Sequence, residues 1–289
     1  MALAARATAR ARRVLREIGA DAVVGGGGYV AGPVGLAALS LRLPLVLTEA
    51  DSHLGVANRL LAPRARRVFL AFPLAGRDGD RYRVVGRPIP AGTIGADRAA
   101  ARERFGIGPD ERCLLVFGGS LGARTINEAT VEAFGAAAPC AVLHACGRRD
   151  HEQIAARLEA LGSPLHYHLL PYISPFADAL AAADLAVARS GGSVFEVAAA
   201  GLPSILVPYP HATADHQTLN ARHIAAGGAA VVVPDGELDG PRLAREVGAL
   251  LADPGRMRAM GNAASELARP DAAQAVAREV VALARERGR

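Results

Sequence analysis

Short apolar runs that alternate with helical segments constrain this chain more than any other feature of its sequence. Beyond residue 112, six such runs are expected to be strands: Cys113–Phe117, Ala141–His144, His166–Leu170, Leu185–Ala188, Ser204–Val207 and Ala230–Val233. Because helical segments separate them, neighbouring strands should run parallel, with helices covering both faces of the sheet. The alternation therefore predicts an α/β fold built on a doubly wound parallel sheet.

A shorter series of the same kind lies nearer the N-terminus. After a helical segment over residues 1–19, four strands are expected: Asp21–Val24, Pro44–Thr48, Arg67–Phe72 and Tyr82–Val85. A glycine-rich turn follows the first of them and should lead into a helix from about Pro33 to Leu41. The C-terminal part should be helical in three segments: Pro241–Leu251, Pro254–Ala268 and Asp271–Arg287.

The clearest linker is Gly86–Gly92, which combines prolines and glycines. It predicts two Rossmann-like domains with the following bounds: residues 1–86 for the first, 87–95 for the linker, 96–269 for the second, and 270–289 for a helix expected to pack back on the first. Doubly wound domains normally begin with a strand whose glycine loop holds phosphate. Since a helical segment comes first here, we expect the first domain to be incomplete at its N-terminus.

Composition indicates a globular protein of the cytoplasm. The chain has 289 residues, of which 51% are hydrophobic and 21% charged, so two domains of ordinary size fit. No apolar run is long enough to cross a bilayer, and arginines recur through Arg16, which argues against a signal peptide. The three cysteines form neither a CxxC pair nor a metal-binding spacing, so we expect reduced, buried thiols.

The charge balance favours anionic partners. The net charge is +5, yet only 4% of residues are aromatic and no arginine-rich recognition motif occurs. Base stacking and groove reading therefore have no support, and we expect no nucleic-acid partner. An anionic substrate or an anionic membrane surface fits this balance better.

A glycine pair after the fourth strand of the second series could hold a nucleotide sugar. Gly191 and Gly192 let the backbone approach a ligand, and Ser193 is expected to cap the helix that follows, whose N-terminus suits an anion. Glu196 falls in the first turn, where a carboxylate suits two adjacent sugar hydroxyls better than a phosphate. An ordinary βαβ turn with a Ser193–Glu196 capping box explains this stretch equally well.

A second glycine loop follows the first strand of the same series. Gly118–Arg124 reads GGSLGAR between a strand and a helix, and such a loop can cradle phosphate with its N–H groups and the Ser120 hydroxyl. The spacing is not that of a P-loop, so ATP hydrolysis is not favoured. Glycines serving only the packing of strand against helix remain an alternative of at least equal weight.

Two polar clusters lie where other strands end. Asp215–Gln217 and Asn220 follow the strand Ser204–Val207, and neutral amides such as Gln217 fit the recognition of sugar hydroxyls. Thr48–His53 contains Glu49 and Asp51 and could face a cleft, although Asp51 or Ser52 could instead cap the next helix. No carboxylate triad or HxxxH helix accompanies the histidines, so no metal site is expected.

Several segments together resemble the MurG family, the N-acetylglucosaminyltransferases of peptidoglycan synthesis. The resemblance covers nearly the whole chain from Asp21 onward, and three motifs in this order are its most specific part: GGYVAGP at 27–33, GGSLGAR at 118–124, and the run from Glu196 to Pro203. It implies the GT-B fold of two Rossmann-like domains. It also implies transfer of GlcNAc from UDP-GlcNAc to the C4 hydroxyl of undecaprenyl-diphospho-MurNAc-pentapeptide, with inversion and no cofactor.

The resemblance also implies roles for individual residues. The donor-binding set would be Ser120, Ile173, Arg189, Gly191, Gly192, Ser193, Glu196 and Gln217. Within that set Glu196 would hold the ribose hydroxyls, Ile173 would place its backbone against uracil, and Gln217 would contact the GlcNAc hydroxyls. The acceptor side would comprise Tyr29, Glu49, Asp51 and Asn58. The arginine-rich first helix resembles the family's membrane-associated surface, which implies a peripheral protein on the cytoplasmic face of the cell membrane.

The chain departs from the family pattern in four places. The opening strand and its GGTGGH-type loop are absent, and with them the family's candidate base, so no catalytic base is assigned and Glu49 is a candidate. An in-frame GGTGGH-like segment is expected in the upstream DNA. The family's Glu-Gln-Asn reads Glu-Ala-Asp at 49–51, its GNPVR reads GRPIP at 86–90, and the donor loop before Glu196 is one residue shorter.

Other functions remain open at this stage. One is a different GT-B enzyme, such as a glycolipid glycosyltransferase or a UDP-GlcNAc 2-epimerase. Another is a non-catalytic donor-binding fragment, or one subunit of a split enzyme. The GGYVAGP motif argues against the other enzymes, and transfer to an acceptor would separate all of these readings.

Overall fold

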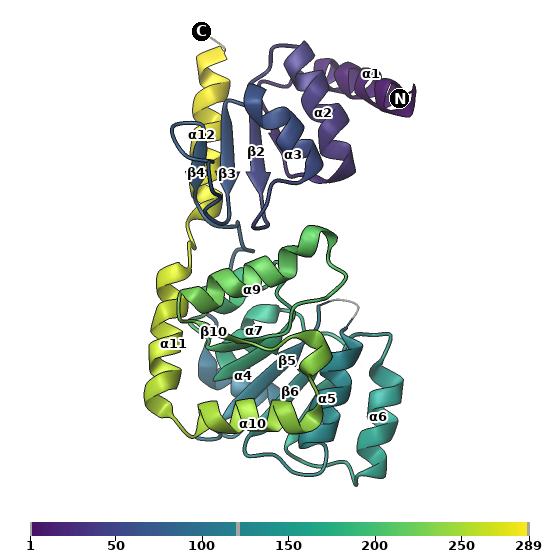
Figure 1. Ribbon diagram of the computed structural model, residues 1–289, viewed down its shortest axis with the longest axis vertical. Coiled ribbons are helices and arrows are strands. Elements are labelled where there is room, and N and C mark those ends of the chain that lie inside the picture. Colours follow the sequence, from purple (N-terminus) through teal and green to yellow (C-terminus); the bar gives the residue numbers. More distant parts are fainter. Residues whose placement is uncertain (1, 120–121, 288–289) are drawn as a thin grey trace. The chain divides into compact units, whose positions relative to one another are not determined.

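The computed structural model describes residues 2–119 and 122–287. The chain divides into a first unit, Met1–Ile89 with Arg269–Arg289, and a second unit, Pro90–Ala268 (Figure 1). Each unit is a parallel sheet covered by helices, so the predicted α/β fold with two parallel-sheet domains is confirmed.

The second unit is built on six parallel strands in the order β10-β9-β8-β5-β6-β7. Their bounds are β5 Cys113–Phe117, β6 Ala141–Ala145, β7 Tyr167–Leu170, β8 Leu185–Ala188, β9 Ser204–Leu206 and β10 Ala230–Val232. The helices are α4 Arg98–Phe105, α5 Arg124–Phe134, α6 His151–Ala160, α7 Phe176–Ala182, α8 Val194–Ala199, α9 His216–Ala226, α10 Gly240–Leu251 and α11 Pro254–Leu267. Two short 3-10 turns, η2 Thr213–Asp215 and η3 Asp235–Glu237, complete it.

Alternation along β5 shows why this sheet has helices on both faces. Leu114 and Val116 point into one core with α5, α6 and α10, whereas Leu115 and Phe117 point into another with α4 and α7. Every β5 residue is buried, as expected for a central parallel strand, whose sequence reads as an unbroken apolar run. Since β5, β8 and β9 are neighbours, the loops that leave their carboxyl ends meet at one edge of the sheet.

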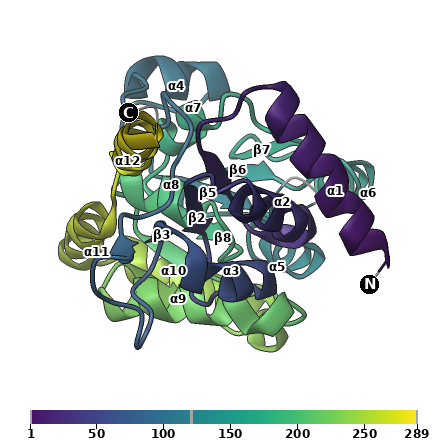
Figure 2. The ribbon, with the colours of Figure 1, turned by 90° about the horizontal axis from the view of Figure 1, so that it is seen from above.

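The first unit has four parallel strands in the order β1-β2-β3-β4: β1 Val23–Gly25, β2 Leu45–Glu49, β3 Arg67–Leu70 and β4 Tyr82–Val84. Its helices are α1 Ala2–Glu17, α2 Gly28–Ser40, α3 Val56–Leu61 and α12 Ala272–Arg287, with the 3-10 turn η1 Ala62–Arg64. In both ribbon views α1 lies against α2 (Figures 1 and 2). The helix α2 covers one face of the sheet through Ala38.

The other face of that sheet is covered by α12, which returns from the far end of the chain (Figure 1). Its Leu283 packs on Val46 and Phe69. Glu279 of α12 also lies 2.7 Å from Arg67 and 3.3 Å from Arg83, measured between carboxylate oxygen and guanidinium nitrogen. Charge pairing and apolar burial together explain why this last helix belongs to the first unit.

Helix starts were the weakest part of the sequence expectations. The helix expected from Pro33 begins five residues earlier, at Gly28, and contains Pro33 in its interior. Gly27 and Gly28 have φ angles of 83° and 74°, so the chain turns on glycines and enters the helix at once. The capping alternative for Asp51 or Ser52 is also wrong, because Gly55 occupies the N-cap position of α3.

Candidate functional site

Within the second unit, one cavity lies at the edge where the loops after β5 and β8 meet. It has a volume of about 200 Å³ and is lined by Phe117, Gly119, Ala145, Tyr172, Ile173, Phe176, Ser193 and Glu196. The rings of Phe117 and Phe176 meet edge to face with centroids 4.9 Å apart. The cavity is thus an apolar, aromatic-walled slot with one carboxylate in its lining, which suits a planar base attached to a sugar.

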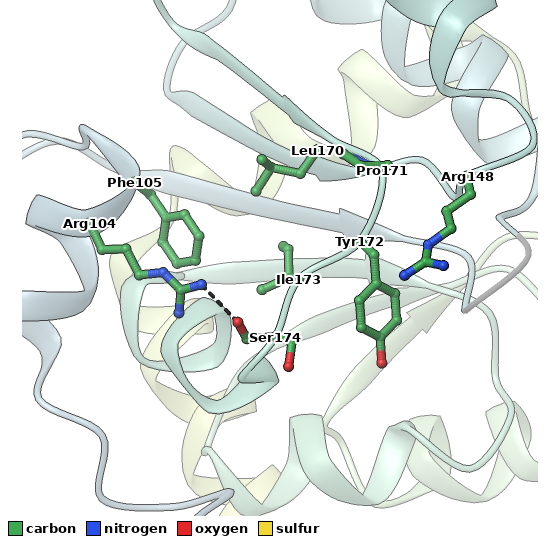
Figure 3. A pocket seen from close by; sticks show the side chains of 8 residues that line it. All are labelled: Arg104, Phe105, Arg148, Leu170, Pro171, Tyr172, Ile173 and Ser174. Atoms are coloured by element: carbon green, nitrogen blue, oxygen red, sulfur yellow. Dashed lines mark hydrogen bonds between the residues drawn. The ribbon is translucent and has the colours of Figure 1, made fainter.

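Ile173, expected at the base-binding position, is buried and forms a wall of this slot. Its other side faces a second cavity of about 370 Å³, drawn in Figure 3. There the Arg104 guanidinium donates to the Ser174 carbonyl at 2.8 Å, and that of Arg148 lies over the Tyr172 ring at 6.0 Å. Arg104 thereby anchors the segment that presents the Ile173 backbone.

The glycine pair after β8 offers backbone donors beside the slot. The carbonyls of Gly191, Gly192 and Ser193 accept bonds from the first residues of α8. Among the residues that the structure describes, no acceptor pairs with the N–H groups of these three residues. The expectation that Ser193 caps the helix is wrong in its chemistry: Ser193 occupies the N-cap position, but its side chain makes no capping bond. Glu196 lies in the first turn of α8, as predicted.

The loop after β5 supplies a second set of donors. Its end packs closely on the next strand, because a Cβ on Gly122 would lie 2.1 Å from the Cys146 carbonyl oxygen. Helix α5 begins directly afterwards at Arg124, and no side chain caps its N-terminus. The N-terminus of an eleven-residue helix after a glycine loop suits an anion, and the Asp235 carboxylate already accepts from the Thr125 hydroxyl in its first turn at 3.2 Å. Ser120, predicted to contact the diphosphate, lies outside the described residues.

Gln217 lies beside the glycine pair, as its predicted role requires. Its Oε1 accepts from the Tyr209 N–H at 3.0 Å, and a Cβ on Gly191 would lie 3.8 Å from its Nε2. The Ser190 hydroxyl donates to the Gln217 carbonyl at 2.8 Å. The side-chain amide is therefore held in a fixed orientation, and within the described part of the chain its Nε2 has no acceptor.

Arg189 is engaged with protein groups around the same edge. One of its guanidinium nitrogens donates to Asp235 and to the carbonyls of Val207 and Pro208, and the guanidinium lies 5.5 Å from the Tyr209 ring. The contact that the family resemblance implies for Arg189 stays a prediction. What the structure adds is a clamp that joins the loops following β8, β9 and β10.

The acceptor-side residues of the first unit gather around Glu49. This buried carboxylate accepts from the Gly55 N–H at 2.8 Å and from Asn58 Nδ2 at 3.0 Å, and more weakly from the N–H groups of Ala50 and Asp51. Asn58 Nδ2 also donates to the Thr48 carbonyl, and its buried Oδ1 has no partner among the described residues. Because Glu49 is saturated with donors, the geometry favours an organising role for it over that of a base.

Tyr29 stands fully exposed at the start of α2, directly after the glycine turn. Asn58 lies under that turn, since a Cβ on Gly27 would come within 3.5 Å of its Nδ2. The structure therefore brings Glu49, Asp51, Asn58 and the glycine turn together in the first unit and leaves the Tyr29 ring free to contact a ligand.

A chain of buried polar side chains lies behind the loop after β5. His144 is fully buried, and its ring nitrogens meet the Tyr167 hydroxyl at 2.7 Å and Asn127 Oδ1 at 3.0 Å. Asn127 Nδ2 donates to Asp150 at 3.0 Å. Burial lowers the pKa of His144 from 6.5 to about 3, so this imidazole is neutral in the folded protein.

A pH dependence of stability follows from His144. Above the pKa of the unfolded chain, His144 is neutral in both the folded and the unfolded state, and its protonation does not lower stability. Below that pKa, the unfolded chain binds a proton that the folded chain excludes. Between about pH 7 and pH 5, the free energy of unfolding should therefore fall by about 2 kcal/mol. Urea unfolding of the native chain and of His144→Gln at both pH values checks it, since the variant should lack that part of the loss. Equal losses in both proteins would contradict the assignment.

The aromatic slot and the buried polar chain are the functional features that sequence reasoning missed. Phe117 is the last residue before the GGSLGAR loop, and Phe176 begins the helix three residues after Ile173. Both positions lie beside segments that the sequence analysis singled out, and this proximity is the sequence signal that could have indicated the slot. Over residues 2–119 and 122–287, no group of three or more His, Cys, Asp or Glu side chains could hold a metal ion, and no helix is long and apolar enough to cross a membrane.

Known proteins are similar to this chain in sequence. The glycosyltransferase family 28 N-terminal domain matches residues 2–70, and the C-terminal domain of that family matches residues 113–276. A transferase of Moorella thermoacetica, named UDP-N-acetylglucosamine--N-acetylmuramyl-(pentapeptide) pyrophosphoryl-undecaprenol N-acetylglucosamine transferase, is 45% identical over 91% of this chain and 74% of its own length. A protein of the same name from Corynebacterium jeikeium is 41% identical over 94% of this chain and 74% of its own.

Solved structures agree with the sequence relatives. The crystal structure of Acinetobacter baumannii MurG superimposes with a TM-score of 0.77 at 32% identity, covering 94% of this chain and 76% of that one. A putative UDP-N-acetylglucosamine 2-epimerase of Listeria monocytogenes reaches a TM-score of 0.73, but at 18% identity that likeness shows the fold alone. The predicted GT-B architecture is confirmed, and the chain belongs to glycosyltransferase family 28 and, within it, to the MurG family of N-acetylglucosamine transferases.

Proposed function

We propose that this chain transfers GlcNAc from UDP-GlcNAc to the C4 hydroxyl of undecaprenyl-diphospho-MurNAc-pentapeptide, giving lipid II. The observation that carries the proposal is the aromatic-walled slot of the second unit, with Glu196 in its lining and glycine-loop donors beside it. Relatives at 41–45% identity are named for this transfer.

The donor fits the second unit group by group. Uracil occupies the slot between Phe117, Phe176 and Ile173, with its polar edge against the Ile173 backbone. Glu196 accepts hydrogen bonds from the ribose hydroxyls. The diphosphate lies against the N–H groups of Gly191, Gly192 and Ser193 and the N-terminus of α5, and Gln217 Nε2 donates to a GlcNAc hydroxyl.

The reaction is a single displacement at the anomeric carbon. The acceptor oxygen forms a bond to C1 as the bond from C1 to the UDP oxygen breaks, and the electron pair leaves with the β-phosphate. Backbone N–H groups aimed at that phosphate stabilise the developing negative charge without having to reorganise. The proton of the acceptor hydroxyl passes to a general base. Glu49 is a poor candidate for that base, because its carboxylate already accepts hydrogen bonds from Gly55 and Asn58.

Donor recognition can be tested by calorimetric titration with UDP-GlcNAc, UDP and ADP. A slot of about 200 Å³ accommodates a pyrimidine more readily than a purine. We therefore expect UDP-GlcNAc and UDP to bind. ADP should bind at least about tenfold more weakly, because adenine cannot make the hydrogen bonds that uracil makes in the slot. Equal affinity for ADP and UDP would contradict the assignment of the slot.

The acceptor is anchored in a membrane, and the first unit carries a surface suited to one. All five arginines of α1 are exposed: Arg6, Arg10, Arg12, Arg13 and Arg16. Leu3 and Val14 of the same helix are also exposed, and basic residues with exposed apolar side chains on one helix favour an anionic interface. A groove of about 330 Å³ in this unit is lined by Arg42, Arg64 and Arg66 together with apolar side chains, and Glu286 in the same lining pairs with Arg66. These features support a peripheral protein on the cytoplasmic face of the membrane.

Vesicle sedimentation tests this surface. Replacing Arg6, Arg10 and Arg12 by glutamine should weaken binding to phosphatidylglycerol vesicles about a hundredfold, at about 1 kcal/mol for each arginine near the surface. A matched control makes the same change in net charge at three exposed arginines of the second unit: Arg245, Arg256 and Arg258. A similar loss in the control, or tight binding to neutral phosphatidylcholine vesicles, would contradict an α1 membrane surface.

A further inference from the structure

Four buried polar side chains form a hydrogen-bonded chain behind the glycine loop. Tyr167, His144, Asn127 and Asp150, here called the His144 network, come from β7, β6, α5 and the residue before α6. None of these four residues is more than 8% exposed, so a bound donor cannot touch most of the network directly. Polar groups are costly to bury unless each finds a partner, and these do.

The hydrogen bonds fix one arrangement of protons along the network. Asn127 Nδ2 uses its two hydrogens on the Cys146 carbonyl at 2.8 Å and on Asp150 Oδ2 at 3.0 Å. Its Oδ1 must therefore accept from His144 Nε2–H at 3.0 Å. The other ring nitrogen, Nδ1, is then an acceptor, and the Tyr167 hydroxyl donates to it at 2.7 Å. The Asn127 amide, fixed by the Cys146 carbonyl and Asp150, thus sets the tautomer of His144, and the bond from Tyr167 holds the ring in place against Asn127.

The network ends at the carbonyl on which the glycine loop rests. The Cys146 carbonyl accepts from Asn127 and lies so close to Gly122 that a Cβ there would come within 2.1 Å of the oxygen. The Gly122 N–H in turn donates to the Gly119 carbonyl at 3.0 Å. A shift of the Cys146 carbonyl would therefore displace the end of the loop and the N-terminus of α5 that follows.

We propose that Tyr167 and His144 are positioning residues for the loop after β5, acting through Asn127 and the Cys146 carbonyl. The inference rests on the proposed function, in which this loop holds the donor diphosphate. It assigns neither residue a contact with the donor. Their expected effect is on donor binding, with the acceptor's KM unchanged, because the loop belongs to the donor side alone.

Substitutions at His144 separate positioning from folding. His144→Met removes both ring nitrogens, whereas the side-chain amide of His144→Gln can still donate to Asn127 Oδ1. We expect the Kd for UDP and the KM for UDP-GlcNAc to rise about tenfold in His144→Met and to stay within about threefold of native in His144→Gln, since small misplacements of binding groups have large effects. Tyr167→Phe, which keeps the ring, should fall between them and serves if His144→Met does not fold.

Thr130→Val is the matched control. Thr130 lies on α5, as Asn127 does, and is fully buried. Its hydroxyl donates to the Ile126 carbonyl at 2.6 Å and not to any residue of the His144 network. It should destabilise the protein without changing UDP affinity. If His144→Met and Tyr167→Phe leave UDP affinity and donor KM where Thr130→Val leaves them, the proposal is wrong.

Amide hydrogen exchange gives a readout that does not depend on the donor. The Gly122 amide should exchange faster in His144→Met and Tyr167→Phe than in native protein, and at the native rate in Thr130→Val. Unchanged exchange at Gly122 in the first two variants would overturn the positioning role. Faster exchange in both variants, combined with a native chain that binds no UDP, would leave the positioning role standing and refute the proposed function instead.

Discussion

Replacing Glu196 by alanine is expected to lower kcat/KM for UDP-GlcNAc about a hundredfold. Glu196 lines the slot in the first turn of α8, where its carboxylate can accept from both ribose hydroxyls. Hydrogen bonds to a charged acceptor contribute about 1.5–3 kcal/mol each, and about 1.4 kcal/mol corresponds to a factor of ten. Most of the loss should appear in donor binding, because the ribose takes no part in the bond changes.

A donor analogue makes this prediction specific. UDP-GlcNAc lacking the ribose 2′-hydroxyl should be a poor substrate for the native chain, and Glu196→Ala should no longer distinguish it from UDP-GlcNAc. Glu237→Ala, at an exposed carboxylate of the same unit that pairs with Arg242, should behave as native. If the variant still discriminates between the two donors as strongly as the native chain, Glu196 does not hold the ribose.

Gly122→Ala is expected to weaken UDP binding about a hundredfold while the second unit still folds. Gly122 has a φ of 77°, and an added Cβ would lie 2.1 Å from the Cys146 oxygen and 3.0 Å from its carbon. Neither neighbour is a flexible side chain, so the loop must move. Displacing a binding group by about 1 Å can weaken binding about a hundredfold, and this loop is the one proposed to hold the diphosphate.

Gly106→Ala controls for backbone strain alone. Gly106 also has a left-handed φ, 68°, but the nearest atom to its Cβ would be His168 Cε1 at an ordinary 3.7 Å. Strain of about 1–2 kcal/mol should lower its melting temperature without changing UDP affinity. Calorimetric titration and thermal unfolding of both variants give the comparison. Native UDP affinity in Gly122→Ala would show that the loop after β5 does not hold the diphosphate.

Periodicity in the sequence predicted the strands because parallel strands buried on both faces read as uninterrupted apolar runs. Cys113–Phe117 and Leu185–Ala188 were predicted with their observed bounds. Helix starts were predicted less well, since they depend on backbone angles that residue type does not determine. Two glycines in the left-handed region start α2 ahead of Pro33, and the Ser193 side chain makes no capping bond although its type favours one.

The candidate site could be predicted where it consists of contiguous motifs. Glu196 and the glycine pair lie within six residues of each other, and the family resemblance assigned them together. Phe117 and Phe176 meet only after β5 and α7 have packed. Likewise, His144 of β6 contacts Asn127 only after α5 has packed on the sheet. Such pairs depend on tertiary packing and on proton positions, which no local pattern encodes.

The most direct test of the account is a transfer assay on the purified chain. UDP-[14C]GlcNAc and a lipid-linked MurNAc-peptide diphosphate would be incubated together, and the lipid product identified by mass spectrometry. The account predicts a product heavier by one N-acetylhexosamine, UDP release that requires the acceptor, and rates of both that fall about a hundredfold in Glu196→Ala when the donor concentration lies well below KM. UDP-GlcNAc binding without any transfer would contradict it and identify the chain as a donor-binding protein, while release of UDP from the donor alone would favour a different reaction.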